Sequence, residues 1–134
     1  MVFQKNTIWV LDDNIDDLKL FKEAFFELNP EYKLVTFRNW KQIITELNLN
    51  NVPELLFLDL NLGSVSGFDM IDKIRQHIFF KNVPKIIIYT DSTSISNQQK
   101  AFAKGANMYL VKPTSFEDLK KQIKQICTSH FKFF

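Results

Sequence analysis

The chain has 134 residues, 46% of them hydrophobic and 24% charged, and a formal net charge of +2. These values predict one globular domain with its own core, and such a small net charge gives no reason to expect a nucleic-acid partner. With one cysteine, Cys127, an internal disulfide is excluded, and no signal pattern or membrane-spanning apolar run occurs, so we expect a cytoplasmic protein with no membrane association.

Five short apolar runs of strand length recur along the chain. Several are apolar at consecutive positions, which is typical of strands covered on both faces, as in a parallel sheet. The runs are TIWVL (7–11), KLVTF (33–37), ELLFL (54–58), KIIIY (85–89) and NMYLV (107–111).

Helical patterns, with apolar residues three and four positions apart, follow each run. Gly105 stands near the end of the fourth pattern, where a glycine often ends a helix, and Ser115 precedes the fifth as a suitable N-cap. Alternating strands and helices predict an α/β fold, in which right-handed crossovers give a parallel sheet covered on both faces. The patterns run over residues 15–28, 40–47, 70–78, 95–106 and 116–126, and a tail is expected from about residue 129.

Polar and charged residues follow four of the five predicted strands. The first strand ends at Asp12 and Asp13, the third at Asp59, the fourth at Thr90 and the fifth at Lys112. Because ligands of open α/β sheets bind outside the carboxyl ends of the strands, we consider these residues as one set.

Three carboxylates at one edge cannot all stay ionised without a counter-charge, and one lysine is not enough. Oxygen donors without His or Cys favour Mg²⁺ or Ca²⁺ over a transition metal. A metal ion and Lys112 could together neutralise a phosphoryl group, and Thr90 could donate a hydrogen bond to it. The nucleophile would then be a carboxylate, which forms an aspartyl phosphate.

Each of these residues also has an ordinary structural interpretation. Asp12 or Asp13 alone could be a helix cap, Asp59 and Thr90 could begin turns, and Lys112 could be a loop lysine. Their convergence from four strands on one edge favours the functional interpretation.

In this combination the motifs resemble the receiver domain of two-component response regulators, over residues 1–128, with 129–134 as a short tail. The resemblance implies a flavodoxin-like, doubly wound sheet of five parallel strands, in the order 2-1-3-4-5, with five helices. The matching features are Asp12–Asp13, LFLDLNL around Asp59, Gly67, Thr90, Tyr109 and VKP at 111–113.

The resemblance also implies roles for these residues. Asp59 would accept a phosphoryl group from a phosphohistidine of a sensor histidine kinase or a histidine phosphotransfer protein. Mg²⁺ would be bound by Asp13, Asp59 and the backbone carbonyl of Asn61, with Asp12 helping through water. Lys112 would bind the phosphoryl oxygens.

A switch is the second implication. Thr90 would move toward the phosphoryl group and Tyr109 would turn inward, although Tyr109 could also be an ordinary aromatic residue of a buried strand. The face formed by the fourth helix, fifth strand and fifth helix would then change partners. We expect a stand-alone receiver that signals to a downstream protein or by forming a phosphorylation-dependent homodimer, and not a classical enzyme.

Two positions depart from the family pattern. Gly63 stands where the family often has proline, and Asp91 follows Thr90 where the family usually has alanine or glycine. A carboxylate at position 91 is expected to slow phosphoryl uptake from small anionic donors, unless it points into solvent.

Other functions remain open at this stage. A flavin-binding protein could share the fold, but DDNIDD after the first strand would repel a phosphate. A haloacid-dehalogenase-type phosphatase would need two aspartates separated by one residue, and here they are adjacent. The strongest alternative is a receiver-like interaction module that works without phosphorylation.

Overall fold

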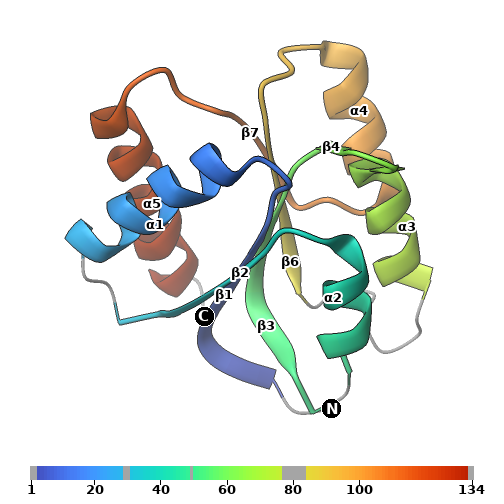
Figure 1. Ribbon diagram of the computed structural model, residues 1–134, viewed down its shortest axis with the longest axis horizontal. Coiled ribbons are helices and arrows are strands. Elements are labelled where there is room, and N and C mark those ends of the chain that lie inside the picture. Colours follow the sequence, from blue (N-terminus) through green and yellow to red (C-terminus); the bar gives the residue numbers. More distant parts are fainter. Residues whose placement is uncertain (1–2, 29–30, 49, 77–83, 133–134) are drawn as a thin grey trace.

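A computed structural model describes residues 3–28, 31–48, 50–76 and 84–132 (Figure 1). The end of the third helical pattern, at Ile78, lies outside these residues. None of the described helices has the length and apolar character needed to cross a membrane.

A five-stranded parallel sheet forms the centre of the molecule, in the order β2-β1-β3-β6-β7. This arrangement confirms the predicted flavodoxin-like order. Every residue of β3 is buried, as the run of consecutive apolar positions predicts. The strands are β1 (Phe3–Leu11), β2 (Lys33–Phe37), β3 (Val52–Leu58), β6 (Lys85–Thr90) and β7 (Met108–Val111).

In the described part of the chain five helices cover the sheet, α1 and α5 on one face and α2, α3 and α4 on the other (Figure 1). Gly105 ends α4 with a left-handed φ of 115°, and the hydroxyl of Ser115 accepts the Asp118 N–H at the start of α5, both as predicted. The helices are α1 (Ile15–Leu28), α2 (Trp40–Glu46), α3 (Gly67–Gln76), α4 (Ile95–Lys104) and α5 (Phe116–Lys132).

The last helix is longer than the sequence pattern indicates. We expected the helix to end near residue 128, but α5 continues to Lys132, so most of the segment 129–134 is helical. No strong stop signal, such as proline or glycine, follows Ile126 in the sequence, which is why the helix can continue beyond the predicted end.

A small antiparallel hairpin between β3 and α3 was not predicted. It pairs β4 (Asn61–Leu62) with β5 (Val65–Ser66). Gly63 in its turn has a φ of 75°, which proline cannot adopt, so the departure from the family pattern has a local structural reason. After the hairpin, Gly67 lies so close to the end of β3 that a Cβ there would be only 2.3 Å from the backbone oxygen of Asp59. Glycine, which has no Cβ, allows this close approach. The hairpin is thereby held against the end of β3.

Candidate functional site

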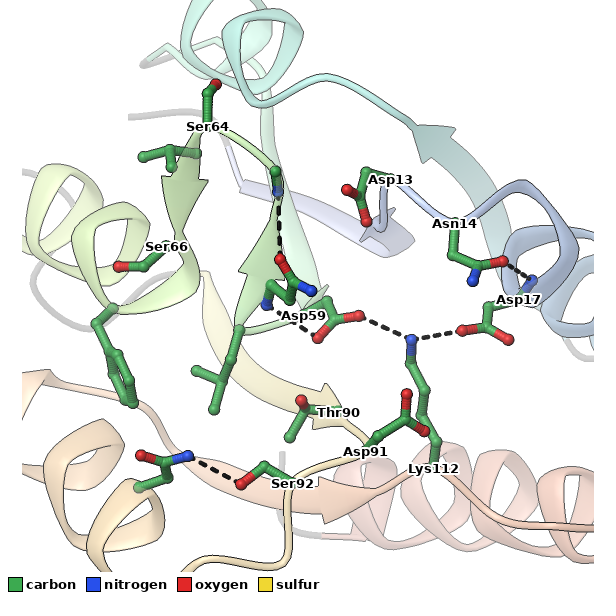
Figure 2. Close-up of a pocket in the computed structure, with 16 residues that line it drawn as sticks. Asp13, Asn14, Asp17, Asp59, Ser64, Ser66, Thr90, Asp91, Ser92 and Lys112 are labelled. Carbon is green, nitrogen blue, oxygen red and sulfur yellow. Dashed lines mark hydrogen bonds and ion pairs between the residues drawn. The ribbon is translucent and has the colours of Figure 1, made fainter.

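The carboxyl ends of the strands open into a pocket of about 570 Å³, which Figure 2 shows in close-up. Asp13, Asp59, Thr90 and Lys112 all line it, so the residues predicted at four strand ends do come together. Asp12 lies beside them, 2% exposed.

The ammonium group of Lys112 is the centre of the charge arrangement. Its Nζ lies 2.8 Å from Oδ2 of Asp12, 2.7 Å from Oδ2 of Asp59 and 2.6 Å from Oδ2 of Asp17. The lysine side chain is only 7% exposed. One cation therefore bonds three carboxylates in a largely buried setting, where such contacts are stronger than at the surface.

Burial and the ion pairs shift the pKa values of Lys112 and Asp12. Burial disfavours the charged form of Lys112, but the hydrogen bonds that it donates to Asp12, Asp17 and Asp59 outweigh burial and raise the pKa of the ammonium above its usual value. Burial raises the pKa of Asp12 to about 6, although Lys112 and the Asn14 N–H both favour the carboxylate. Lys112 is therefore a permanent cation, whereas Asp12 titrates close to neutral pH.

Local hydrogen bonds hold the end of β1. Asp12 Oδ1 accepts the Asn14 N–H at 3.0 Å, and Asn14 Oδ1 accepts the Asp17 N–H at 3.1 Å. Asn14 is thus the cap of α1, so neither Asp12 nor Asp13 is needed for that structural role. Asp13 is exposed, and its Oδ2 would lie 3.5 Å from a Cβ placed on Gly63, across the pocket.

The end of β3 is ordered by its own turn. Asp59 is 6% exposed, and its Oδ1 accepts the Asn61 N–H at 3.2 Å while Oδ2 bonds Lys112. The side chain of Asn61 accepts the Gly63 N–H at 3.4 Å. Asp59 is consequently held in one orientation toward the pocket (Figure 2).

Thr90 and Lys112 end neighbouring strands and are joined through the backbone. The Lys112 N–H donates to the Thr90 carbonyl at 2.7 Å, and Thr90 is 4% exposed. Asp91 follows on the exposed side and lines the pocket together with Ser92.

Tyr109 lies apart from the pocket lining. It is half-buried on β7, and its hydroxyl donates to the Ser92 carbonyl at 2.9 Å. This bond connects the Tyr109 side chain to the loop that follows Thr90, its predicted partner in the switch.

Asp13, Asp59 and Asn61 all line the pocket, and their oxygen donors suit a hard cation such as Mg²⁺. Among the residues that the structure describes, no three Asp, Glu, His or Cys side chains are arranged to hold a metal ion as they stand. Lys112 supplies the counter-charge of Asp12 and Asp59 instead. The donors therefore fit a cation chemically, and a bound cation would have to share Asp59 with the lysine.

Asp17 is a site residue that the sequence analysis missed. The signal for it was its place in the first turn of the helix that directly follows Asp12 and Asp13. From this turn its carboxylate faces the strand ends (Figure 2).

Residues 8–124 match the family model of the response regulator receiver domain. A probable methanogenesis regulatory protein, FilR2 of Methanothrix harundinacea, is 30% identical over 124 residues, which are 89% of this chain and 79% of that protein. Several other relatives are longer proteins, and the chain spans 9–25% of three of them.

Two solved structures share the fold. The phosphorylated cyanobacterial phytochrome response regulator RcpA has a TM-score of 0.80 and 21% identity, over 95% of this chain and 96% of that one. The Mn²⁺-bound form of response regulator Rcp1 has a TM-score of 0.77 and 24% identity, over 90% and 91% of the two chains.

Proposed function

The chain belongs to the response regulator receiver family, and from this premise we propose that it is a cytoplasmic phosphoacceptor protein. In this proposal Asp59 receives a phosphoryl group from a phosphohistidine of a sensor histidine kinase or a histidine phosphotransfer protein. The phosphorylated form of the domain signals through a downstream protein or as a homodimer.

The single observation that carries the proposal is the environment of Asp59. Its carboxylate lines the pocket, and the Asn61 N–H and the Lys112 ammonium bond one oxygen each. In the transfer, a carboxylate oxygen forms a bond to phosphorus, the bond from phosphorus to the histidine nitrogen breaks, and the imidazole leaves with the electron pair. Lys112 is then next to the phosphoryl oxygens and neutralises part of their charge.

We assign Mg²⁺ as the cofactor, with Asp13, Asp59 and the backbone carbonyl of Asn61 as ligands and Asp12 acting through water. When bound, the cation would neutralise charge on the transferring phosphoryl group. The likeness to the Mn²⁺-bound Rcp1 supports a divalent cation, and the all-oxygen donors favour Mg²⁺.

Thr90 and Tyr109 form the proposed switch. The hydroxyl of Thr90 turns to the phosphoryl group, and Tyr109 gives up its bond to the Ser92 carbonyl as the loop moves. The exposed side chains of α4 and β7, among them Ile95, Phe102 and Met108, then change their arrangement for a protein partner.

The test is intact mass spectrometry of the wild type and of Asp59→Asn after incubation with acetyl phosphate, with and without Mg²⁺. We expect one phosphoryl adduct, only in the wild type and only with the metal. An adduct that persists in Asp59→Asn would assign the site elsewhere. No adduct in any sample, with histidine phosphodonors included, would favour the interaction module that works without phosphorylation.

A further inference from the structure

Asp17 contacts the central cation of the site from the side opposite Asp59. Figure 2 shows the Lys112 ammonium between the two carboxylates, and the distance to Asp17 Oδ2, at 2.6 Å, is the shortest of its three ion pairs. The Asp17 side chain is 30% exposed, compared with 8% for Asp59. The proposed function gives this residue no role.

An ammonium group has three N–H donors, and here three carboxylates share them. Two of the three belong to the proposed cation site, Asp59 as a direct ligand and Asp12 through water. The third, Asp17, lies on the opposite side of the ammonium group from Asp59 and competes with the other two carboxylates for its N–H donors. The stronger its bond to Lys112, the weaker the hold of Lys112 on the other two carboxylates.

We propose that Asp17 is a positioning residue for Lys112: by sharing the ammonium it weakens the bonds from Lys112 to Asp12 and Asp59, and so leaves these carboxylates more available to a divalent cation. This inference rests on the proposed function, because it concerns the same site. It also predicts that Lys112 stays beside Asp59 when the cation enters, held by Asp17, and is ready to bind a phosphoryl oxygen.

Asp16 provides a matched control. It is the neighbouring acid in the first turn of α1, it carries the same charge, and it is exposed, with no ion pair to any described residue. Asp16→Asn therefore reproduces the loss of one negative charge near the helix N-terminus without touching Lys112.

The experiment is a calorimetric titration of the wild type, Asp17→Asn and Asp16→Asn with Mg²⁺ at pH 7.5, on samples whose folding is checked by circular dichroism. We expect Asp17→Asn to raise the Kd for Mg²⁺ about threefold to tenfold over Asp16→Asn, because the ammonium then bonds the metal-binding carboxylates more strongly. Equal Kd values, or tighter binding by Asp17→Asn, would overturn the inference and leave the proposed function standing. A wild type that binds no Mg²⁺ would overturn both.

A double-mutant cycle separates positioning from simple attraction of the cation by a nearby charge. In a Lys112→Met background the positioning effect has no lysine to act on, so Asp17→Asn should change the Kd no more than Asp16→Asn does. An unchanged excess effect of Asp17→Asn without the lysine would show that Asp17 acts on the cation directly, and would overturn the inference.

Discussion

An acidic side chain is buried near each end of β3, and the two have different neighbours. Glu54, near the amino end, is 3% exposed, and Asp59, just past the carboxyl end, is 6% exposed. Glu54 acts electrostatically on Tyr32 and Cys127. Asp59 bonds a lysine and lines a pocket.

At the amino end the neighbouring groups are kept neutral. Burial, together with the charge of Glu54, raises the pKa of the Cys127 thiol to about 11, and burial likewise raises the pKa of Tyr32 above its usual value. The thiol therefore stays protonated at neutral pH and behaves as a small core residue, not as a nucleophile. The two buried acids thus differ in what surrounds them: Glu54 acts on core groups, whereas Asp59 lines a pocket and bonds Lys112.

The largest expected effect is a difference in the rate of phosphoryl uptake between substitutions at the two ends of β3. Lys112→Met removes the cation beside Asp59 and should slow uptake from acetyl phosphate by about 10²-fold, the usual cost of removing a group that stabilises developing charge. Glu54→Gln, its control at the other end, should leave the rate within about twofold, since its effects stay in the core. Uptake is followed by intact mass at saturating Mg²⁺. Similar losses in both variants would mean that the ends are not functionally distinct.

A pH experiment tests the charge state of the carboxyl end. The pKa of Asp12 is raised from 3.8 to about 6 in the folded protein, so its contribution to stability is full below pH 3.8 and is lost as the pH rises through 6. Asp12→Asn cannot ionise and should gain about 1–2 kcal/mol in free energy of unfolding, relative to wild type, between pH 5 and pH 8. Urea unfolding at both pH values measures this difference. A difference that does not change with pH would show that Asp12 does not titrate in this range.

A smaller effect is expected from Asp91, at the rim of the carboxyl end. Its carboxylate is exposed and lines the pocket that a small phosphodonor must enter. Asp91→Ala should speed uptake from acetyl phosphate about twofold to fivefold. The screened repulsion between an exposed carboxylate and the anionic donor amounts to about 1 kcal/mol or less. The rate is measured at two ionic strengths. A gain that does not shrink with salt would assign the effect to side-chain bulk. No gain would mean that the Asp91 carboxylate points into solvent and does not affect uptake.

The smallest effect on stability should come from an ion pair that lies at neither end of β3. Lys104 and Asp72 join α4 to α3 at the surface, with side chains 27% and 37% exposed. Asp72→Asn should lower the free energy of unfolding by less than about 1 kcal/mol, and raised salt should reduce the effect further. A loss as large as several kcal/mol in urea unfolding would contradict the expectation that a partly exposed ion pair stabilises the fold only weakly.

Much of the fold, and the place of the site, could be predicted from the sequence. Consecutive apolar runs indicate strands covered on both faces, and parallel strands bring their carboxyl ends to one edge. The convergence of Asp13, Asp59, Thr90 and Lys112 follows from that geometry, and the structure brings these side chains together around one pocket.

Three features were decided only by the tertiary structure. The β4–β5 hairpin has strands of two residues, too short for a periodic signal, and depends on the positive φ of Gly63 and its packing against the end of β3. The length of α5 has no stop signal in the sequence. The pairing of Lys112 with Asp17 depends on where α1 lies over the sheet, because a sequence pattern can set the face of a helix but not which partner that face meets.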